Sequence, residues 1–302
     1  MNSSTLSDRD RYLAGTSMVM ISSLGLALNL SIFFKFADRK QLLNAFYVLC
    51  FSKSISNSII CLINLLWIGP AILLTNLFLP ILVNQFLGQL NEYGIYMMGP
   101  LTQVSMGLDR FFVIFLPLKM SDQKRCSIST WGIFVSWLMS VVFVAYSYPN
   151  DCWVFFSLED LNYKTYNTSC DDRNIDIVFL LCIVLALISS IIQVSNFIKL
   201  LIRASKKRST QNSSSNRRRT IRLFAQSVIQ DFLHCLDVLN SRDLFHVTTS
   251  TGSFFTYTFS LVFVHAVDGF IMCLFHLKWP CSKKNKTAVT RTFSVSSARK
   301  VT

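Results

Sequence analysis

Seven apolar segments, each long enough to cross a lipid bilayer, limit this chain to a membrane-embedded bundle of helices. A helix needs about 20 mostly apolar residues to span the hydrocarbon core, which is about 30 Å thick. Only 15% of the residues are charged, whereas soluble domains carry about 25% charged residues. This composition argues against a water-soluble enzyme and excludes an intrinsically disordered chain.

The predicted fold is an all-α membrane protein, a seven-transmembrane helix bundle in residues 13–277. A polar tail (1–12) precedes the bundle and a basic tail (278–302) follows it. The predicted spans are 13–36, 45–67, 92–116, 129–148, 174–202, 221–238 and 254–275.

Two segments fit this pattern poorly. The segment 73–89 is apolar but contains Asn76, Pro80 and Asn84, and we interpret it as an extracellular connector. The sixth span is the weakest because it carries several polar residues, namely Gln226, Gln230, Asp231, His234 and Asp237. One Asp near a helix centre costs about 2.5–3.5 kcal/mol on insertion scales. Neighbouring helices must therefore shield this span.

The positions of the basic residues predict the orientation of the bundle. Most Lys and Arg residues fall in segments that are cytoplasmic when the N-terminus is extracellular and the C-terminus is cytoplasmic, as the positive-inside rule requires. Topology and attraction to the anionic lipid of the bilayer then explain the net charge of +13. No nucleic-acid partner is expected.

Several sites of covalent modification are predicted from this orientation. Asn2 and Asn167 begin glycosylation sequons on the outer side. Cys152 and Cys170 share the long outer loop, where a disulfide between them would contribute about 3 kcal/mol; the alternative is two unpaired thiols. Cys281, beside basic residues after the seventh span, is a candidate for palmitoylation.

A charged motif stands at the end of the third span. The sequence reads Asp109-Arg110-Phe111 and, after five residues, Pro117-Leu118. It resembles the Asp-Arg-Tyr…Pro-Leu signature of rhodopsin-like G protein-coupled receptors, with Phe in place of Tyr. Arg110 is expected to pair at rest with Asp109 or with an acid on the sixth span, and to donate to an inserted partner when the helices separate. The alternative is an ordinary interfacial charge pair.

Further segments resemble the nematode serpentine receptors of class X. They are Cys50-Phe51-Ser52-Lys53-Ser54-Ile55-Ser56-Asn57, Leu87-Gly88-Gln89-Leu90, Trp153-Val154-Phe155, Gln226-Ser227 and His265-Ala266-Val267-Asp268-Gly269-Phe270-Ile271-Met272. The resemblance implies a chemosensory receptor that binds an external small-molecule cue and activates a heterotrimeric G protein. It also implies a multi-pass protein of the plasma membrane, displayed on sensory neurons, where cilia are the expected site.

Two intramembrane charges are expected to meet. Lys53 lies about 15 Å deep in the second span, and Asp268 lies at a similar depth in the seventh. We predict that they pair inside the bundle as a state-dependent switch, with Asn29 donating to Asp268 and His265 on the same helix face. The alternative is that Lys53 extends to the interface.

A ligand pocket is predicted near the outer ends of the third and seventh spans. The candidate lining residues are Tyr93, Tyr96, Met97, Thr256 and Tyr257. Aromatic residues at this depth also form interfacial belts, which is the alternative interpretation.

Two alternative functions stay open: a transporter or ligand-gated channel that uses the intramembrane charges, and a degenerate receptor that does not signal. The absence of an internal repeat argues against a transporter. No catalytic motif and no Cys/His spacing typical of a metal site is present in the sequence, so no enzyme, cofactor or metal is expected.

Overall fold

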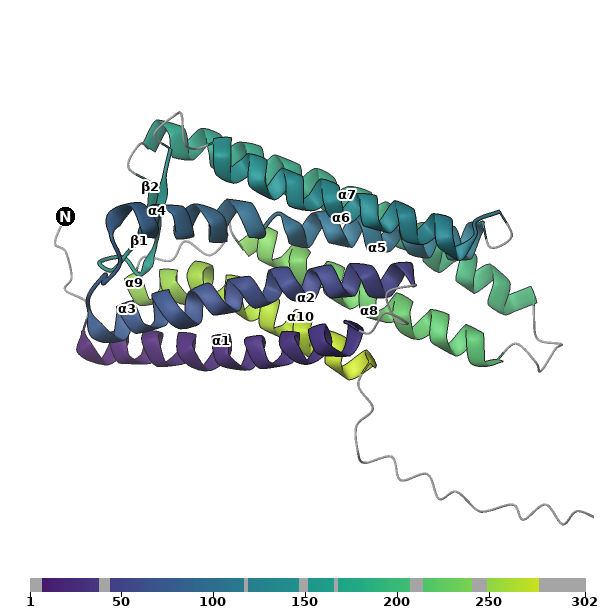
Figure 1. Ribbon diagram of the computed structural model, residues 1–302, viewed down its shortest axis with the longest axis horizontal. Coiled ribbons are helices and arrows are strands. Elements are labelled where there is room, and N and C mark those ends of the chain that lie inside the picture. Colours follow the sequence, from purple (N-terminus) through teal and green to yellow (C-terminus); the bar gives the residue numbers. More distant parts are fainter. Residues whose placement is uncertain are drawn as a thin grey trace, which may run out of the picture.

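Seven helical segments lie side by side along one long axis (Figure 1). The computed structural model describes residues 7–37, 44–116, 119–146, 152–165, 168–206, 214–240 and 249–276. In chain order the segments are α1 (Asp8–Phe36); α2 (Ala45–Ile63), η1 (Asn64–Ile68) and α3 (Gly69–Leu74); α4 (Ile81–Gln89), η2 (Leu90–Ile95) and α5 (Met98–Phe115); α6 (Asp122–Tyr146); α7 (Thr168–Lys206); α8 (Ser214–Asn240); and α9 (Ser250–Ser253), η5 (Phe254–Phe259) and α10 (Ser260–His276). The elements η1, η2 and η5 are π-helical turns inside longer helices. The predicted seven-helix bundle is confirmed.

The third helical segment begins earlier than the sequence predicted. It starts at Ile81, whereas we started the third span at Glu92 and placed 73–89 in a connector. The Pro80 carbonyl accepts the N–H groups of Val83 and Asn84 at 2.9 and 3.0 Å. Proline is well tolerated at a helix start, where its missing N–H has no intrahelical partner to lose. The residue that we interpreted as a break therefore precedes the first turn of this helix.

A short β-hairpin lies across one end of the bundle (Figure 1). Strand β1 (Val154–Ser157) pairs antiparallel with β2 (Asn162–Thr165), so that Val154 lies opposite Thr165 and Ser157 opposite Asn162. We call this end of the bundle the hairpin end, and the opposite end, where α5 carries Arg110, the Arg110 end. α1 begins at the hairpin end and α10 finishes at the Arg110 end.

The hairpin is held by residues of α4. The Asn84 side chain accepts the Phe156 N–H at 3.0 Å and donates to the Phe156 carbonyl at 3.3 Å. Gln89 accepts the Val154 N–H at 3.4 Å. Gly88 allows this close approach, because a Cβ at this position would lie 2.5 Å from the Val154 carbonyl oxygen. The start of the third helical segment thus positions the hairpin.

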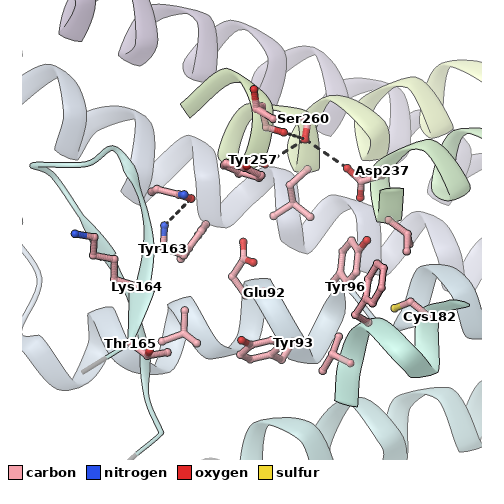
Figure 2. Close-up of a pocket in the computed structure, with 17 residues that line it drawn as sticks. Glu92, Tyr93, Tyr96, Tyr163, Lys164, Thr165, Cys182, Asp237, Tyr257 and Ser260 are labelled. Carbon is pink, nitrogen blue, oxygen red and sulfur yellow. Dashed lines mark hydrogen bonds between the residues drawn. The ribbon is translucent and has the colours of Figure 1, made fainter. Parts of the chain in front are cut away.

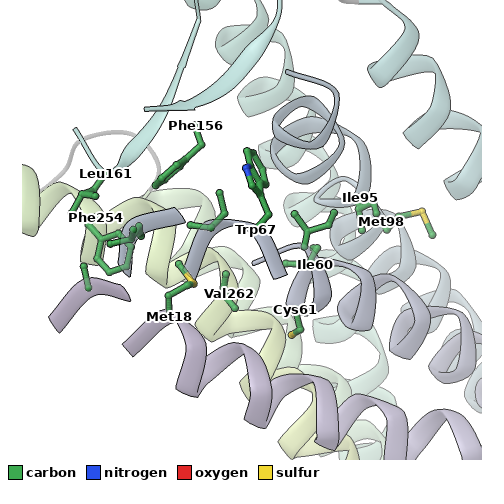
Figure 3. Close-up of a cluster of buried hydrophobic side chains, with 14 residues drawn as sticks. Met18, Ile60, Cys61, Trp67, Ile95, Met98, Phe156, Leu161, Phe254 and Val262 are labelled. Atoms are coloured by element: carbon green, nitrogen blue, oxygen red, sulfur yellow. The ribbon is translucent and has the colours of Figure 1, made fainter. Parts of the chain in front are cut away.

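The hairpin also contributes to a hydrophobic cluster that joins it to the helices (Figure 3). Phe156 is fully buried and packs edge-on against Trp67, with the two ring centroids 6.2 Å apart. Met18 of α1 and Phe254 of η5 belong to the same cluster. Burial of a large apolar side chain contributes about 1.5–3 kcal/mol, so the hairpin is an integral part of the core.

The outer faces of several helices are apolar. Trp131 and Phe134 on α6 and Leu180 and Ile191 on α7 are largely exposed, as expected for side chains that contact lipid. By length and composition, five of the described helices could cross a membrane: Asp8–Phe36, Ala45–Leu74, Asp122–Tyr146, Asp176–Ile202 and Ser250–His276.

The sixth helical segment, α8, is shielded by its neighbours, as its composition requires. α8 packs against α5, α7 and α10. The polar residues that weaken it as a membrane span are all buried: Gln226, Gln230, Asp231, His234 and Asp237. Its stability inside a bilayer therefore depends on contacts between helices.

Candidate functional site

A cavity of about 290 Å³ lies between the helices at the hairpin end (Figure 2). Its walls come from η2 and the first turn after it, the hairpin, α7, α8, η5 and the start of α10. The lining residues include Glu92, Tyr93, Tyr96, Tyr163, Lys164, Thr165, Phe179, Cys182, Asp237, Thr256, Tyr257 and Ser260.

Most of the residues predicted for a ligand pocket line this cavity. Tyr93, Tyr96, Thr256 and Tyr257 do so. Met97 is buried behind the lining, where its Sδ lies 3.6 Å from the Cys182 Sγ. Four of the five predicted residues therefore line the cavity, and Met97 packs behind the lining residue Cys182.

Two acidic residues of the cavity were not predicted from the sequence. Glu92 precedes Tyr93 and stands four residues before Tyr96, a spacing that places it on the same helix face as Tyr96. Asp237 was considered only as an obstacle to membrane insertion, yet it lines the cavity and accepts a hydrogen bond from the Ser260 hydroxyl at 3.4 Å. A polar residue in a weak span is therefore a useful signal for a pocket.

The hairpin closes one side of the cavity and is tied to the seventh helical segment. The Thr258 hydroxyl donates to the Leu161 carbonyl at 3.1 Å, and the Asn162 amide donates to the Ser253 hydroxyl at 3.2 Å. Tyr163 is fixed by a 2.7 Å hydrogen bond from the Asn91 amide to its hydroxyl. These contacts hold the strand residues that face the cavity.

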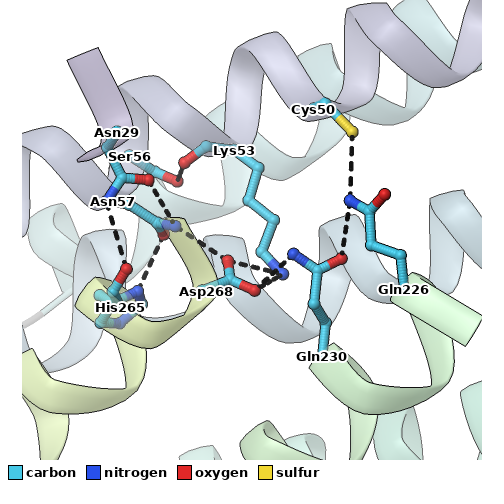
Figure 4. Close-up of polar contacts among 9 residues, drawn as sticks. All are labelled: Asn29, Cys50, Lys53, Ser56, Asn57, Gln226, Gln230, His265 and Asp268. Atoms are coloured by element: carbon cyan, nitrogen blue, oxygen red, sulfur yellow. Dashed lines mark hydrogen bonds and ion pairs between the residues drawn. The ribbon is translucent and has the colours of Figure 1, made fainter. Parts of the chain in front are cut away.

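A polar core occupies the middle of the bundle (Figure 4). The Lys53 Nζ lies 2.9 Å from Oδ2 and 3.1 Å from Oδ1 of Asp268, and both side chains are fully buried. The predicted pair is therefore formed, and Lys53 does not extend to the surface. Its role as a switch stays a prediction.

Two amides complete the environment of the Asp268 carboxylate. Asn57 donates to Oδ2 at 2.9 Å, and Gln230 of α8 donates to Oδ1 at 2.6 Å. A buried ion pair is tolerated only when such hydrogen bonds replace the lost hydration. These partners were not predicted from the sequence, although Asn57 stands one helical turn after Lys53 on the same face.

Asn29 contacts this core differently from the prediction. Its amide donates to the carbonyls of Gly25 and His265, at 2.8 and 3.2 Å, and its oxygen accepts from Asn57 at 3.2 Å. The predicted donation from Asn29 to Asp268 is therefore wrong, because Asn57 stands between them. His265 joins the same network, with its Nδ1 2.9 Å from the Asn57 Oδ1.

One face of α8 contacts α10 at four successive levels, from the cavity to the Arg110 end. These contacts, which we call the α8–α10 contact series, are Ser260 to Asp237 at 3.4 Å, His234 to His265 with ring centroids 5.8 Å apart, Gln230 to Asp268 at 2.6 Å, and His276 to Gln226 at 2.8 Å. The α8 members are spaced by three or four residues, which is the spacing of one helix face.

At the Arg110 end, Asp109 and Arg110 contact residues that were not predicted for them. Among the described residues, the ion pair of Asp109 is with Arg125 of α6, whose Nε and Nη2 lie 3.1 and 2.8 Å from Oδ1. The guanidinium carbon of Arg110 lies 3.7 Å from the centroid of the Phe46 ring. This contact places the Arg110 guanidinium over an aromatic ring, and the predicted pairing of Arg110 with Asp109 or with an acid on the sixth helix stays a prediction.

The remaining predicted residues are only partly covered by the structure. Phe111 stacks on Phe115, with ring centroids 4.4 Å apart. Cys152 is buried and disulfide-bonded. The other predicted positions lie outside the residues or side chains that the structure describes, namely Asn2, Pro117, Leu118, Asn167, Cys170 and Cys281.

The arrangement of the helices is similar to that of a solved receptor. The crystal structure of squid rhodopsin matches with a TM-score of 0.72 at 16% sequence identity, covering 90% of this chain and 83% of the squid chain. At this identity the likeness establishes the fold. No curated protein matches the sequence. The family model of the serpentine type 7TM GPCR chemoreceptor Srx matches residues 19–276.

The chain belongs to the Srx family. As an Srx receptor, it is a chemosensory G protein-coupled receptor and a multi-pass membrane protein.

The sequence segments that resemble this family meet in the structure of the Srx receptor. Segments 50–57 and 265–272 supply Lys53, Asn57, His265 and Asp268 to the polar core. Segments 87–90 and 153–155 meet where Gly88 and Gln89 contact the hairpin. In each of the two cases, segments that are far apart in the sequence are in direct contact in the structure.

Proposed function

We propose that this Srx receptor binds an external small-molecule cue in the hairpin-end cavity and activates a heterotrimeric G protein through the Arg110 end. The family assignment favours this function over a transporter or channel. We further propose that the receptor acts at the plasma membrane of sensory neurons, in their cilia.

The observation that carries the proposal is the α8–α10 contact series. Asp237 and Ser260 line the cavity, while Gln226 and His276 lie toward the Arg110 end. A ligand that binds one arrangement of α8 and α10 better than another shifts the population of the two arrangements along the full length of the helices. The series thus offers a physical link between the cavity and the Arg110 end.

The orientation of the bundle follows the charge pattern of the sequence, with the hairpin end outside. The disulfide-bonded Cys152 precedes the hairpin, and disulfides persist in the oxidising extracellular space. The predicted Cys152–Cys170 bridge and the glycans on Asn2 and Asn167 would stand on this side, and a palmitoylated Cys281 would stand on the other.

At rest, Arg110 is stacked on Phe46, and Asp109 is held by Arg125. In the active arrangement, α8 moves away at this end, and the Arg110 guanidinium donates to backbone carbonyls of the G protein. Leu118, which follows Pro117 in the sequence after α5, would give the G protein an apolar contact.

The Arg110→Ala variant tests this function. We expect it to abolish G-protein activation, whether basal or driven by a panel of odorants, while the surface level of the receptor is unchanged. The assay is activation of a G-protein reporter in a heterologous cell, normalised to surface-tagged receptor.

The matched control is Arg222→Ala, which removes an exposed cation on α8 near the same end. We expect this variant to retain most of the signal. Unchanged signalling by Arg110→Ala would contradict the assigned role of Arg110. Absence of any signal from well-expressed wild type, over the whole panel, would favour the non-signalling alternative.

A further inference from the structure

The cavity lining carries more negative than positive groups. Glu92 and Asp237 provide two carboxylates, and Lys164 is the cation among the described lining residues. The Lys164 ammonium lies 2.6 Å from Asp160, a carboxylate outside the lining. Burial raises the pKa of Asp160, but hydrogen bonds from Lys164 and Ser157, together with the Lys164 charge, outweigh this effect and lower it below the usual value. Asp160 therefore stays charged at neutral pH and compensates Lys164.

Aromatic rings surround the two carboxylates. The lining includes Tyr93, Tyr96, Tyr163, Phe179 and Tyr257. In Figure 2, Glu92 lies between Tyr163 and Tyr96, with its carboxylate directed toward Tyr257. The faces of aromatic rings attract cations, and this attraction reinforces that of a nearby carboxylate.

Polar atoms of the lining also lack partners in the part of the chain that the structure describes. The Tyr257 hydroxyl and the Thr165 hydroxyl are buried and make no hydrogen bond there. Buried hydroxyl groups in native proteins are normally hydrogen-bonded. A molecule in the cavity could supply these partners.

The charges of the lining disfavour two simple ligand classes. A carboxylate ligand would be repelled by Glu92 and Asp237. A neutral apolar ligand would desolvate both acids without replacing their hydrogen bonds. A cavity of about 290 Å³ holds about ten water-sized groups, which limits the ligand to a small molecule.

We propose that the cavity binds a small aromatic amine, with its ammonium group on Glu92 and its ring among the tyrosines. Asp237, which already accepts from Ser260, faces the same space and gives the ammonium a second carboxylate. This inference rests on the proposed function, since it names the ligand class of the cavity proposed there.

The test compares matched compounds on the purified full-length receptor. Each set contains an arylalkyl amine, the alcohol and the carboxylate of the same carbon skeleton, such as 2-phenylethylamine, 2-phenylethanol and phenylacetate. The measurement is the shift in melting temperature as a function of ligand concentration, which reports binding to the folded state. We expect the amines to raise the melting temperature more than their matched alcohols and carboxylates.

Variants then locate the ammonium group. Glu92→Gln should weaken amine binding about tenfold or more, because a hydrogen bond to a charged group contributes at least that factor. The control Glu159→Gln removes an exposed carboxylate of the hairpin turn, outside the lining, and should change amine affinity far less. The assignment of the ammonium group to Glu92 would be contradicted by equal amine affinity in wild type and Glu92→Gln. It would also be contradicted if the control variant lost more amine affinity than Glu92→Gln.

The outcomes separate this proposal from the proposed function. If no amine raises the melting temperature more than its matched alcohol and carboxylate do, the amine proposal is wrong. If an alcohol or carboxylate binds instead and Tyr257→Ala abolishes its binding, the cavity remains the ligand site and only the ligand class is wrong. The Arg110→Ala comparison tests signalling independently of both.

Discussion

Replacing Lys53 by methionine is expected to destabilise the receptor by about 3–5 kcal/mol, the cost of leaving a buried carboxylate without its cation. The Asp268 carboxylate would keep its hydrogen bonds from Asn57 and Gln230 but lose its ion pair with the Lys53 ammonium group, which lies 2.9 Å away. Methionine retains the apolar stem, so the change isolates the charge. The measurement is the melting temperature of the detergent-purified receptor, together with its surface level in cells.

Two further variants make this prediction specific. Lys124→Met removes an exposed lysine and should have little effect. The double variant Lys53→Met with Asp268→Asn should recover part of the lost stability, since it leaves no unpaired charge in the core. A double variant no more stable than Lys53→Met would show that the pair contributes nothing through its charges.

Replacing Arg125 by alanine is expected to destabilise the receptor by about 2–3 kcal/mol, because it leaves the buried Asp109 carboxylate without its two guanidinium donors. The Asp109 side chain is 1% exposed and that of Arg125 is 13% exposed, so the loss should be smaller than at Lys53. The same thermal measurement applies.

The structure provides a matched control for Arg125. Its Nη1 also lies 2.8 Å from Asp122, whose side chain is 86% exposed. Asp122→Asn removes this exposed interaction on the same arginine and should cost about 0–1 kcal/mol. Equal losses in Arg125→Ala and Asp122→Asn would show that the buried contact with Asp109 contributes no more than a surface ion pair.

The helix bundle and the central ion pair could both be predicted from the sequence. Charged residues inside a membrane have few ways to be stabilised, so Lys53 and Asp268 at similar depth predict a contact across 215 residues. Four lining residues of the cavity were also predicted, from their position near one end of the third and seventh spans.

Other contacts could not be predicted, because they depend on the relative rotation and packing of helices. Asp109 could pair with any basic residue at its end of the bundle, and only the packed structure selects Arg125. The hairpin depends on Asn84 and Gly88 contacting strand residues about 70 positions away in the sequence. Asn57 separates Asn29 from Asp268 for the same reason.

We infer that α8 separates from the bundle at the Arg110 end when its contacts with α10 are broken. Double electron–electron resonance on the purified receptor tests this by measuring the distance between two spin labels. The labels are attached to a ketone-bearing amino acid introduced at the exposed positions 124 on α6 and 222 on α8. Wild type is compared with Gln226→Ala/Gln230→Leu, which removes two members of the contact series without removing a charge. At about 1 kcal/mol for the hydrogen bond with His276 and about 1.5 kcal/mol or more for the one to the Asp268 carboxylate, the loss should shift the equilibrium about seventyfold or more.

We expect a population at longer distance between the two labels in the double variant, and a higher basal G-protein activation in the same molecule. Indistinguishable distance distributions in the folded wild type and the folded variant would contradict it, because the contact series would then not control the position of α8.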